Sequence, residues 1–177
     1  MGPFARFYQR FEDLIASAAR IVLYFIHSRR WRENHDAAIK EFLGREGTTL
    51  EVFLPDLASH ELMFSLTRHF DDGPQIPGLV ADAYRYFARL ARDFRKPAEV
   101  WLFSHYPTYT FYAFDERAVL ALYSNTPAKK AIPAFEITMD GLLGKFLASD
   151  IEDLKKGCRR RAPEELEGVI ASAMRPS

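Results

Sequence analysis

Two apolar runs set the architecture of this chain: Ile21-Val22-Leu23-Tyr24-Phe25-Ile26 and Leu50-Glu51-Val52-Phe53-Leu54. Both are rich in β-branched and aromatic residues, which is typical of buried strands. Between them, residues 34–45 place apolar side chains on one face of a helix, and Gly47 ends that helix. This succession of strand, helix and strand predicts a βαβ unit with parallel pairing and a right-handed crossover.

A second group of strands follows further along the chain. Residues 99–104, 108–114 and 118–124 are strand-like, and the tight link Asp115-Glu116-Arg117 predicts an antiparallel hairpin between the last two. A flavodoxin-like or Toll/interleukin-receptor-like domain would share the first βαβ unit, but an all-parallel sheet has no place for antiparallel strands at 99–124. The sequence therefore predicts an α/β fold with a mixed sheet.

The remaining apolar patterns predict flanking helices and one domain. Residues at three- and four-residue spacing indicate helices at 4–18, 59–70, 78–95 and 137–156, with an irregular stretch at 125–135 and a short helix in the tail 163–174. We expect residues 1–177 to form a single domain, with a core at about 10–155 and a basic, helical tail at 156–177.

Composition excludes several classes of protein. The chain has 177 residues, and 24 Lys and Arg balance 24 Asp and Glu, which argues against a nucleic-acid coat. A lone Cys158 excludes a disulfide framework and predicts a reducing, cytoplasmic compartment. The apolar run 21–26 is too short for a membrane span or a signal peptide. The five histidines are scattered, so we expect no metal and no cofactor.

The most informative stretch is Thr108-Tyr109-Thr110-Phe111-Tyr112-Ala113-Phe114-Asp115, followed by Leu122-Tyr123-Ser124-Asn125. Its placement resembles the signature of the phospholipase D superfamily, H-x-K-x-x-x-x-D-x-x-x-x-x-x-G-S-x-N. Asp115 and Asn125 fall in register, whereas Thr108 and Thr110 stand where that family has its histidine and lysine. The resemblance spans about residues 10–155 and implies a phospholipase D-like mixed sheet.

The departures from that signature predict a protein without catalytic residues. In the resembled family the histidine attacks phosphorus, and lysine, serine and asparagine hold the developing charge. Thr108 would need a base to become a nucleophile, and Thr110 supplies no fixed positive charge. The resemblance therefore implies a catalytically inactive binding module, a ligand sensor or protein-docking domain in prokaryotic regulation or phage defence. A single copy of the resembled fold usually forms a two-fold dimer, and aromatic residues such as Tyr109, Phe111 and Tyr112 would suit its interface.

A candidate ligand site follows the first strand. Ligands of open α/β sheets bind beyond the carboxyl ends of strands, where this chain has His27, Arg29, Arg30 and Trp31. Arginine matches phosphate or carboxylate, and tryptophan offers a stacking face, so a nucleotide, another phosphate-containing ligand or an acidic partner would fit. The alternative is a solvated turn in which Trp31 packs on the core and the arginines pair with nearby acids.

Loop residues His105 and Tyr109 border the same expected cleft. An alternative function is a phosphodiesterase or nuclease whose site is rebuilt from His105, His60 or His69 together with Arg29 and Arg30. The basic run 155–161 could contact nucleic acid or an acidic partner, although cations also favour the C-terminus of a helix.

Overall fold

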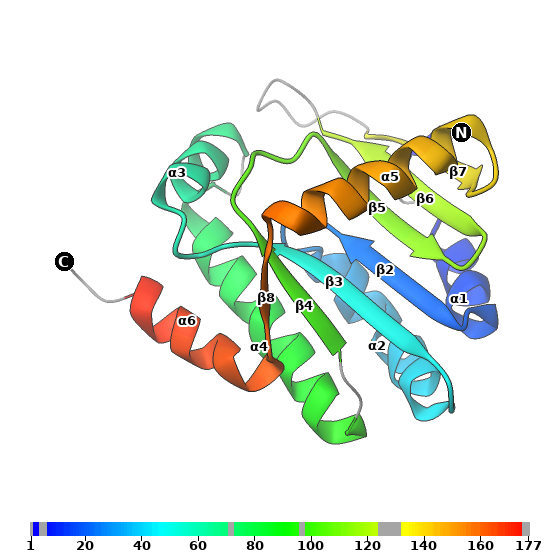
Figure 1. Ribbon diagram of the computed structural model, residues 1–177, viewed down its shortest axis with the longest axis horizontal. Helices are drawn as coiled ribbons and strands as arrows, with labels where there is room; N and C mark the ends of the chain where they lie inside the picture. The colour runs from blue at the N-terminus through cyan, green and yellow to red at the C-terminus, as the bar shows by residue number, and fades with distance from the viewer. Residues whose placement is uncertain (1, 4–6, 71–72, 96–97, 124–131, 175–177) are drawn as a thin grey trace.

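The fold is a mixed, eight-stranded sheet with the strand order β1-β7-β6-β5-β2-β3-β4-β8 (Figure 1). It is seen in a computed structural model that describes residues 2–3, 7–70, 73–95, 98–123 and 132–174. The strands are β1 (Gly2–Pro3), β2 (Arg20–Tyr24), β3 (Thr49–Pro55), β4 (Ala98–Phe103), β5 (Tyr109–Phe114), β6 (Arg117–Leu122), β7 (Pro133–Thr138) and β8 (Arg159–Arg161). The helices are α1 (Tyr8–Ser17), α2 (Arg29–Gly44), α3 (His60–His69), α4 (Ile76–Phe94), α5 (Leu142–Gly157) and α6 (Leu166–Ala173), with short 3-10 turns η2 (Gly73–Gln75) and η3 (Pro163–Glu165).

The sheet changes direction at its centre. Strands β2, β3 and β4 are parallel, which confirms the βαβ unit, and Leu23 pairs with Val52 across its two strands. Strand β5 runs antiparallel to β2, and β5, β6 and β7 are antiparallel to one another, which confirms the predicted hairpin. The fold is therefore not the all-parallel alternative.

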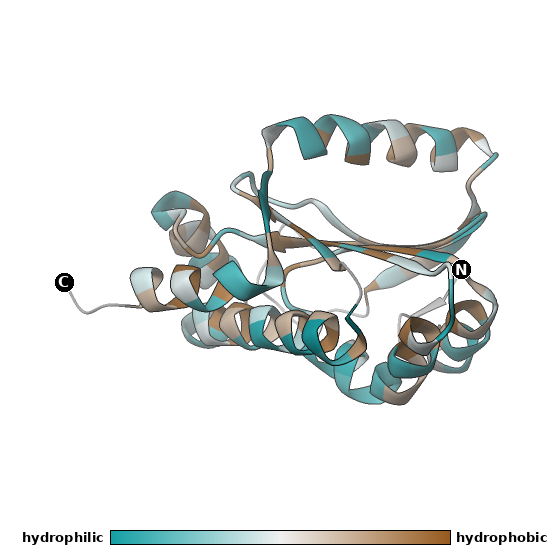
Figure 2. Ribbon diagram, turned by 60° about the horizontal axis from the view of Figure 1, so that its bottom comes forward, coloured by the Kyte–Doolittle hydropathy of each residue, from teal (hydrophilic) through white to brown (hydrophobic). Residues whose placement is uncertain are grey.

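Helices cover the two faces of the sheet unequally. Helices α1, α2 and α4 pack against one face, and α5 crosses the other face (Figure 2). Alternate residues of each strand point to opposite faces, so the strand residues divide between two layers of core. Tyr112 packs against Phe11 of α1, whereas Glu51 on the other face pairs with Lys155 of α5.

Several predicted boundaries were wrong. Residues 29–33 open α2 rather than forming a loop, because Trp31, His35 and Ile39 recur every fourth residue and bury one face of the helix. Residues 133–138 form β7, where an irregular stretch and the start of a helix were expected, and α5 begins only at Leu142.

The start of α5 is fixed by a close approach of the backbone. A Cβ on Gly144 would lie 2.3 Å from the carbonyl oxygen of Thr138, so only glycine fits there.

The predicted tail helix is confirmed as α6. The end of the basic run is an edge strand, β8, paired antiparallel with β4.

Candidate functional site

The position of the resembled family's lysine is occupied by a buried residue of the sheet. Thr110 is 8 % exposed, and its hydroxyl donates a hydrogen bond of 3.0 Å to the carbonyl oxygen of Tyr24. Thr108 is exposed, and its carbonyl oxygen accepts the backbone N–H of Tyr123 at 3.0 Å. Neither threonine has the chemistry or the surroundings of an activated nucleophile.

The aspartate of the motif has a structural task in the turn between β5 and β6. Asp115 adopts a left-handed conformation with φ of 47°. Its carboxylate accepts the backbone N–H groups of Ala19 at 2.8 Å and Arg20 at 2.7 Å, and its own N–H donates to the carbonyl oxygen of Arg20. The hairpin is thereby tied to the first residue of β2. Asn125 lies outside the described residues.

Aromatic side chains fill the core beside Thr110, on the face that α1 and α2 cover. The hydroxyl of Tyr112 lies 2.5 Å from Oγ of Ser28, and its ring lies 5.0 Å from the ring of Trp31. Tyr109, Phe111 and Tyr112 are all at least nine-tenths buried within their own chain. The expectation that these three residues line a dimer interface was therefore wrong.

The opposite face of the sheet, at the same two central strands, carries a polar cluster that we call the tyrosine cluster: Tyr24, His105, Tyr109 and Asp150. Oη of Tyr24 lies 2.9 Å from Nε2 of His105, and Tyr109 donates a hydrogen bond of 2.6 Å to the carboxylate of Asp150 on α5. The rings of Tyr24 and Tyr109 lie 5.2 Å apart. The structure thus brings together two of the predicted site residues, His105 and Tyr109.

Burial sets the protonation of the tyrosine cluster. Removal from water lowers the pKa of His105 and outweighs the opposing effect of Asp150, so the imidazole is neutral near pH 7. Burial also raises the pKa of Tyr24 and of Tyr109, whose hydrogen bond to Asp150 raises it further. Both phenols stay protonated, and the cluster can donate and accept hydrogen bonds without carrying charge on His105.

The other predicted site residues open α2. His27 is half-buried, and its Nδ1 accepts the backbone N–H of Arg29. Arg29 pairs with Glu33 at 2.8 Å, and Arg30 is exposed. Trp31 is 2 % exposed and packs in the core among aromatic rings, so its indole face is covered by its own chain, as the alternative interpretation held.

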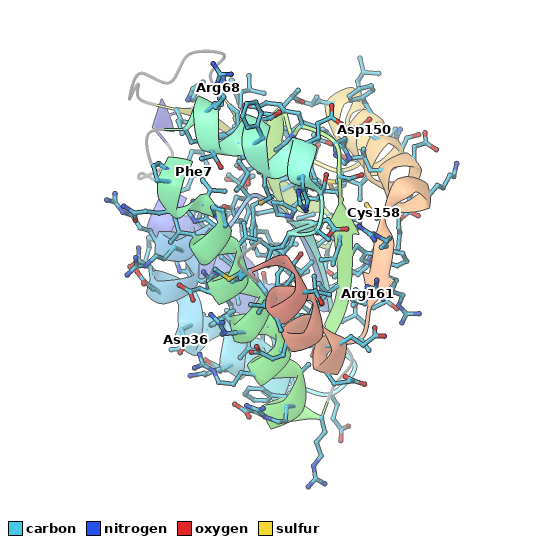
Figure 3. All side chains as sticks on the ribbon, turned by 90° about the vertical axis from the view of Figure 1, so that its left-hand side faces the viewer. Phe7, Asp36, Arg68, Asp150, Cys158 and Arg161 are labelled. Carbon is cyan, nitrogen blue, oxygen red and sulfur yellow. The ribbon has the colours of Figure 1, made fainter. Side chains whose placement is uncertain are left out.

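Sequence reasoning missed Arg32, which directly follows Trp31 in the basic segment after β2. Arg32 is 5 % exposed, its Nε donates to the carbonyl oxygen of His27 at 2.9 Å, and its guanidinium lies over the ring of Tyr86 on α4. It lines a cavity of about 1410 Å³ that extends along both sides of α4. Figure 3 shows Asp36 of α2 and Arg161 of β8 on opposite sides of that helix. The placement of Arg32 depends on tertiary packing, which its sequence neighbours do not reveal.

Acidic partners neutralise the basic run 155–161. Lys155 pairs with Glu51 at 2.6 Å, Arg160 pairs with Glu99 at 2.7 Å, and Arg159 pairs with the buried carboxylate of Asp56. These pairs fasten α5 and β8 to the sheet. Burial raises the pKa of the Cys158 thiol to about 11, so the thiol is protonated and unreactive.

Two further observations concern metals and membranes. Within the residues that the structure describes, no three His, Cys, Asp or Glu side chains are grouped so that they could hold a metal ion. Among those same residues, no helix has the length and apolar character needed to span a bilayer.

Comparison with known proteins identifies the fold. No model of a protein family matches the chain, and no curated protein matches it in sequence. Among solved structures, the phosphatidylserine synthase of Haemophilus influenzae Rd KW20 aligns with a TM-score of 0.56 and 14% identity, over 98% of this chain and 42% of that one. TrmBL2, an archaeal chromatin protein with a novel mode of DNA binding, aligns with a TM-score of 0.55 and 10% identity, over 90% of this chain and 52% of that one.

These matches extend over about half of each solved chain or less. Because that synthase is a member of the phospholipase D-like superfamily, the present chain has a phospholipase D-like fold. At such low identity the likeness concerns the fold alone.

Proposed function

We propose that this chain is a catalytically inactive phospholipase D-like module that acts by binding, as a ligand sensor or a protein-docking domain, and that it works as a homodimer. The observation that carries the proposal is the position of Thr110. Its side chain is buried, and its hydroxyl is bonded to the backbone of the neighbouring strand. Phosphoryl transfer depends on positive charge held against the phosphoryl oxygens, and a buried threonine supplies none.

The rest of the motif supports the same conclusion. The carboxylate of Asp115 is committed to two backbone N–H groups, and the exposed Thr108 is a poor nucleophile without a base. The polar groups that remain near β2 and β5 are suited to binding a ligand. Three arginines lie in the first turn of α2, and the tyrosine cluster supplies hydroxyl and imidazole groups on the other face.

The phosphodiesterase or nuclease alternative has one specific observation in its favour. His105 is neutral near pH 7 and is held by a hydrogen bond to Tyr24, and an oriented neutral imidazole is what a nucleophile or general base requires. In this alternative His105 would carry the reaction in place of Thr108. Arg29 and Arg30, which the alternative uses for positive charge, begin α2 on the other face of the sheet.

A nucleic-acid ligand is the less favoured form of the binding proposal. TrmBL2 binds DNA, and this chain shares its fold. However, three of the cations in the run 155–161 are paired with acids of the sheet, and such pairs leave little charge for phosphate backbones. A small phosphate-containing ligand or an acidic partner at the first turn of α2 fits the charges better.

The proposal is tested by assaying the pure protein for hydrolysis of bis(p-nitrophenyl) phosphate and of plasmid DNA, with and without a chelator. We expect rates equal to the buffer blank. A rate that scales with protein concentration, and that falls to the blank in His105→Gln, would overturn the proposal and establish the alternative. The matched control is Lys145→Gln, which changes an exposed residue of α5 that the alternative does not use and should leave any such rate unchanged.

A further inference from the structure

Arg32 is buried without a charged partner, which is costly for a protein. Arg32 is 5 % exposed, and within the described part of the chain the only hydrogen bond of its side chain is the one from Nε to the carbonyl oxygen of His27. Nη2 is buried and makes no hydrogen bond to any described residue. A guanidinium with unused N–H groups in a dry environment loses hydration without compensation. Burial accordingly lowers the pKa of Arg32.

A second arginine lies on the same tyrosine ring. The guanidinium carbon of Arg32 is 5.1 Å from the ring centroid of Tyr86, and that of Arg89 is 5.7 Å from it. Arg89 is exposed on α4 and forms no ion pair with any residue that the structure describes. Two cations are therefore gathered around one ring at the junction of α2 and α4.

The nearby carboxylates offset this charge only from a distance, and each is paired with another cation. Glu33 pairs with Arg29, Asp36 pairs with Lys40, and Asp82 pairs with Arg85. Glu33 and Asp82 act on Arg32 electrostatically, but neither forms an ion pair with it among the described residues. The hydroxyl of Tyr86 lies beside Asp36, and burial together with that carboxylate raises the pKa of Tyr86.

The start of α2 adds to the positive field. Its first turn carries three arginines and no acidic residue, although the positive end of a helix dipole disfavours cations. Ser28 precedes the helix in a left-handed conformation and does not cap it, because its hydroxyl lies against Tyr112 instead. His27 accepts the N–H of Arg29, but a helix start whose N-cap side chain makes no bond, and around which cations gather, is still suited to an anion.

We propose that the first turn of α2 and the facing part of α4 form a binding site for an oxyanion, the phosphate or carboxylate group of a small molecule, held by Arg32 and Arg89. The inference rests on the proposed function, in which the chain binds a ligand, and it names the chemistry of that ligand. The cavity of about 1410 Å³ that Arg32 and Arg89 line leaves ample room for the rest of a small molecule. Because Nε of Arg32 is already bonded to His27, the remaining guanidinium N–H groups supply the directional contacts, and Arg89 supplies charge from the rim.

The test is a ¹H–¹⁵N NMR titration of the full chain with sodium phosphate and, separately, with sodium acetate, at constant ionic strength. We expect saturable shifts of the backbone amides of residues 30–32. The anion that binds more tightly identifies the ligand group as phosphate or carboxylate. If neither anion shifts these amides, the site does not exist.

Three variants show which arginines are responsible for anion binding. Arg89→Gln should weaken binding by about tenfold or more, and Arg32→Met should abolish it, because each removes a charged hydrogen-bond donor. The matched control is Arg92→Gln, which removes an arginine from the same helix and cavity and should bind as the wild type does. Equal losses in Arg89→Gln and Arg92→Gln would show non-specific attraction and overturn the proposal.

Arg32→Met also separates a ligand-binding role from a structural one. Replacing an unpaired buried charge with an apolar side chain of similar length should raise the melting temperature of the unliganded protein. A lower melting temperature with unchanged binding would show that Arg32 only supports the fold. Hydrolysis in the assay above would refute the inactive module and leave this site standing, whereas a failed titration would refute the site alone.

Discussion

At the scale of single residues, the motif that resembles a catalytic signature has structural tasks. Thr110 bonds to the carbonyl oxygen of Tyr24, and Asp115 gathers two backbone N–H groups at the start of β2. An aspartate can keep its register in such a motif because it organises the hairpin turn, with no reaction to perform. Register alone therefore did not reveal the role of Asp115.

The role of Asp115 leads to a stability prediction. Asp115→Ala removes both acceptors and places alanine at a positive φ, so we expect a loss of about 1–3 kcal/mol in the free energy of unfolding. Asp115→Asn keeps one acceptor and tolerates the left-handed conformation, so its loss should be smaller. Urea denaturation of both variants measures the difference. Equal stability of the wild type and Asp115→Ala would contradict the structural role.

At the scale of elements, α5 is fastened to the sheet through Glu51. Lys155 and Arg20 each approach its carboxylate to 2.6 Å, and the Glu51 side chain is 12% exposed. Burial alone would raise the pKa of Glu51, but the hydrogen bonds from Lys155 and Arg20 outweigh it and hold the pKa below the usual 4.5. The contribution to stability is thus complete above about pH 4.5 and is lost as the pH falls through the lowered folded-state pKa.

A pH series tests this fastening. We expect Glu51→Gln to lose about 1–3 kcal/mol at pH 7, and the difference from the wild type to shrink as the pH approaches 3. Urea denaturation at pH 7, 5 and 3.5 measures both quantities. The exposed Glu152→Gln on α5 is the control. A difference that stays constant across this range would show that ionised Glu51 is not what holds α5.

The sequence predicted the elements better than it predicted their ends. The strands β2 and β3 follow from two apolar runs, and the hairpin follows from the short polar link at 115–117. The predicted start of α2 was wrong, although Ser28 at the N-cap position and the four-residue spacing of Trp31 and His35 carried the signal. Strand β7 was missed because Pro133 favoured an irregular stretch at 125–135 and Ile137 was assigned to the following helix.

The candidate site was less predictable than the fold. The residues predicted to form a basic loop after β2 open α2, and His105 and Tyr109 lie in one cluster; their role as a ligand site stays a prediction. The candidate role of Arg32 could not be predicted from the sequence, because only the packing of α4 against α2 brings Tyr86 and Arg89 beside it. Likewise, the aromatic residues of β5 are buried in the core of their own chain. An apolar strand in the sequence does not indicate whether its side chains are covered by the same chain or by a partner.

At the scale of the whole molecule, the proposed dimer needs a surface other than the buried aromatic residues of β5. The largest exposed apolar side chains on α5 are Leu142, which is 90% exposed, and Phe146, which is 61% exposed, and they lie one turn apart. Such side chains in the open are typical of an interface. We therefore assign the proposed dimer contact to the beginning of α5.

Size-exclusion chromatography with light scattering tests the dimer. The wild type should have twice the mass of one chain at micromolar concentration, and Phe146→Glu should have the mass of a single chain because a buried carboxylate opposes association. The exposed Phe64→Glu on α3 is the matched control and should remain dimeric. A monomeric wild type at this concentration would contradict the assignment.

The central claim is that this phospholipase D-like molecule binds and does not hydrolyse. It is tested most directly by ³¹P NMR of dithymidine monophosphate, a phosphodiester, kept for a day with the pure wild-type protein. We predict that the diester resonance keeps its full area and that no phosphomonoester resonance appears. A monoester resonance that grows in proportion to protein concentration, and that is absent with His105→Gln, would contradict the account.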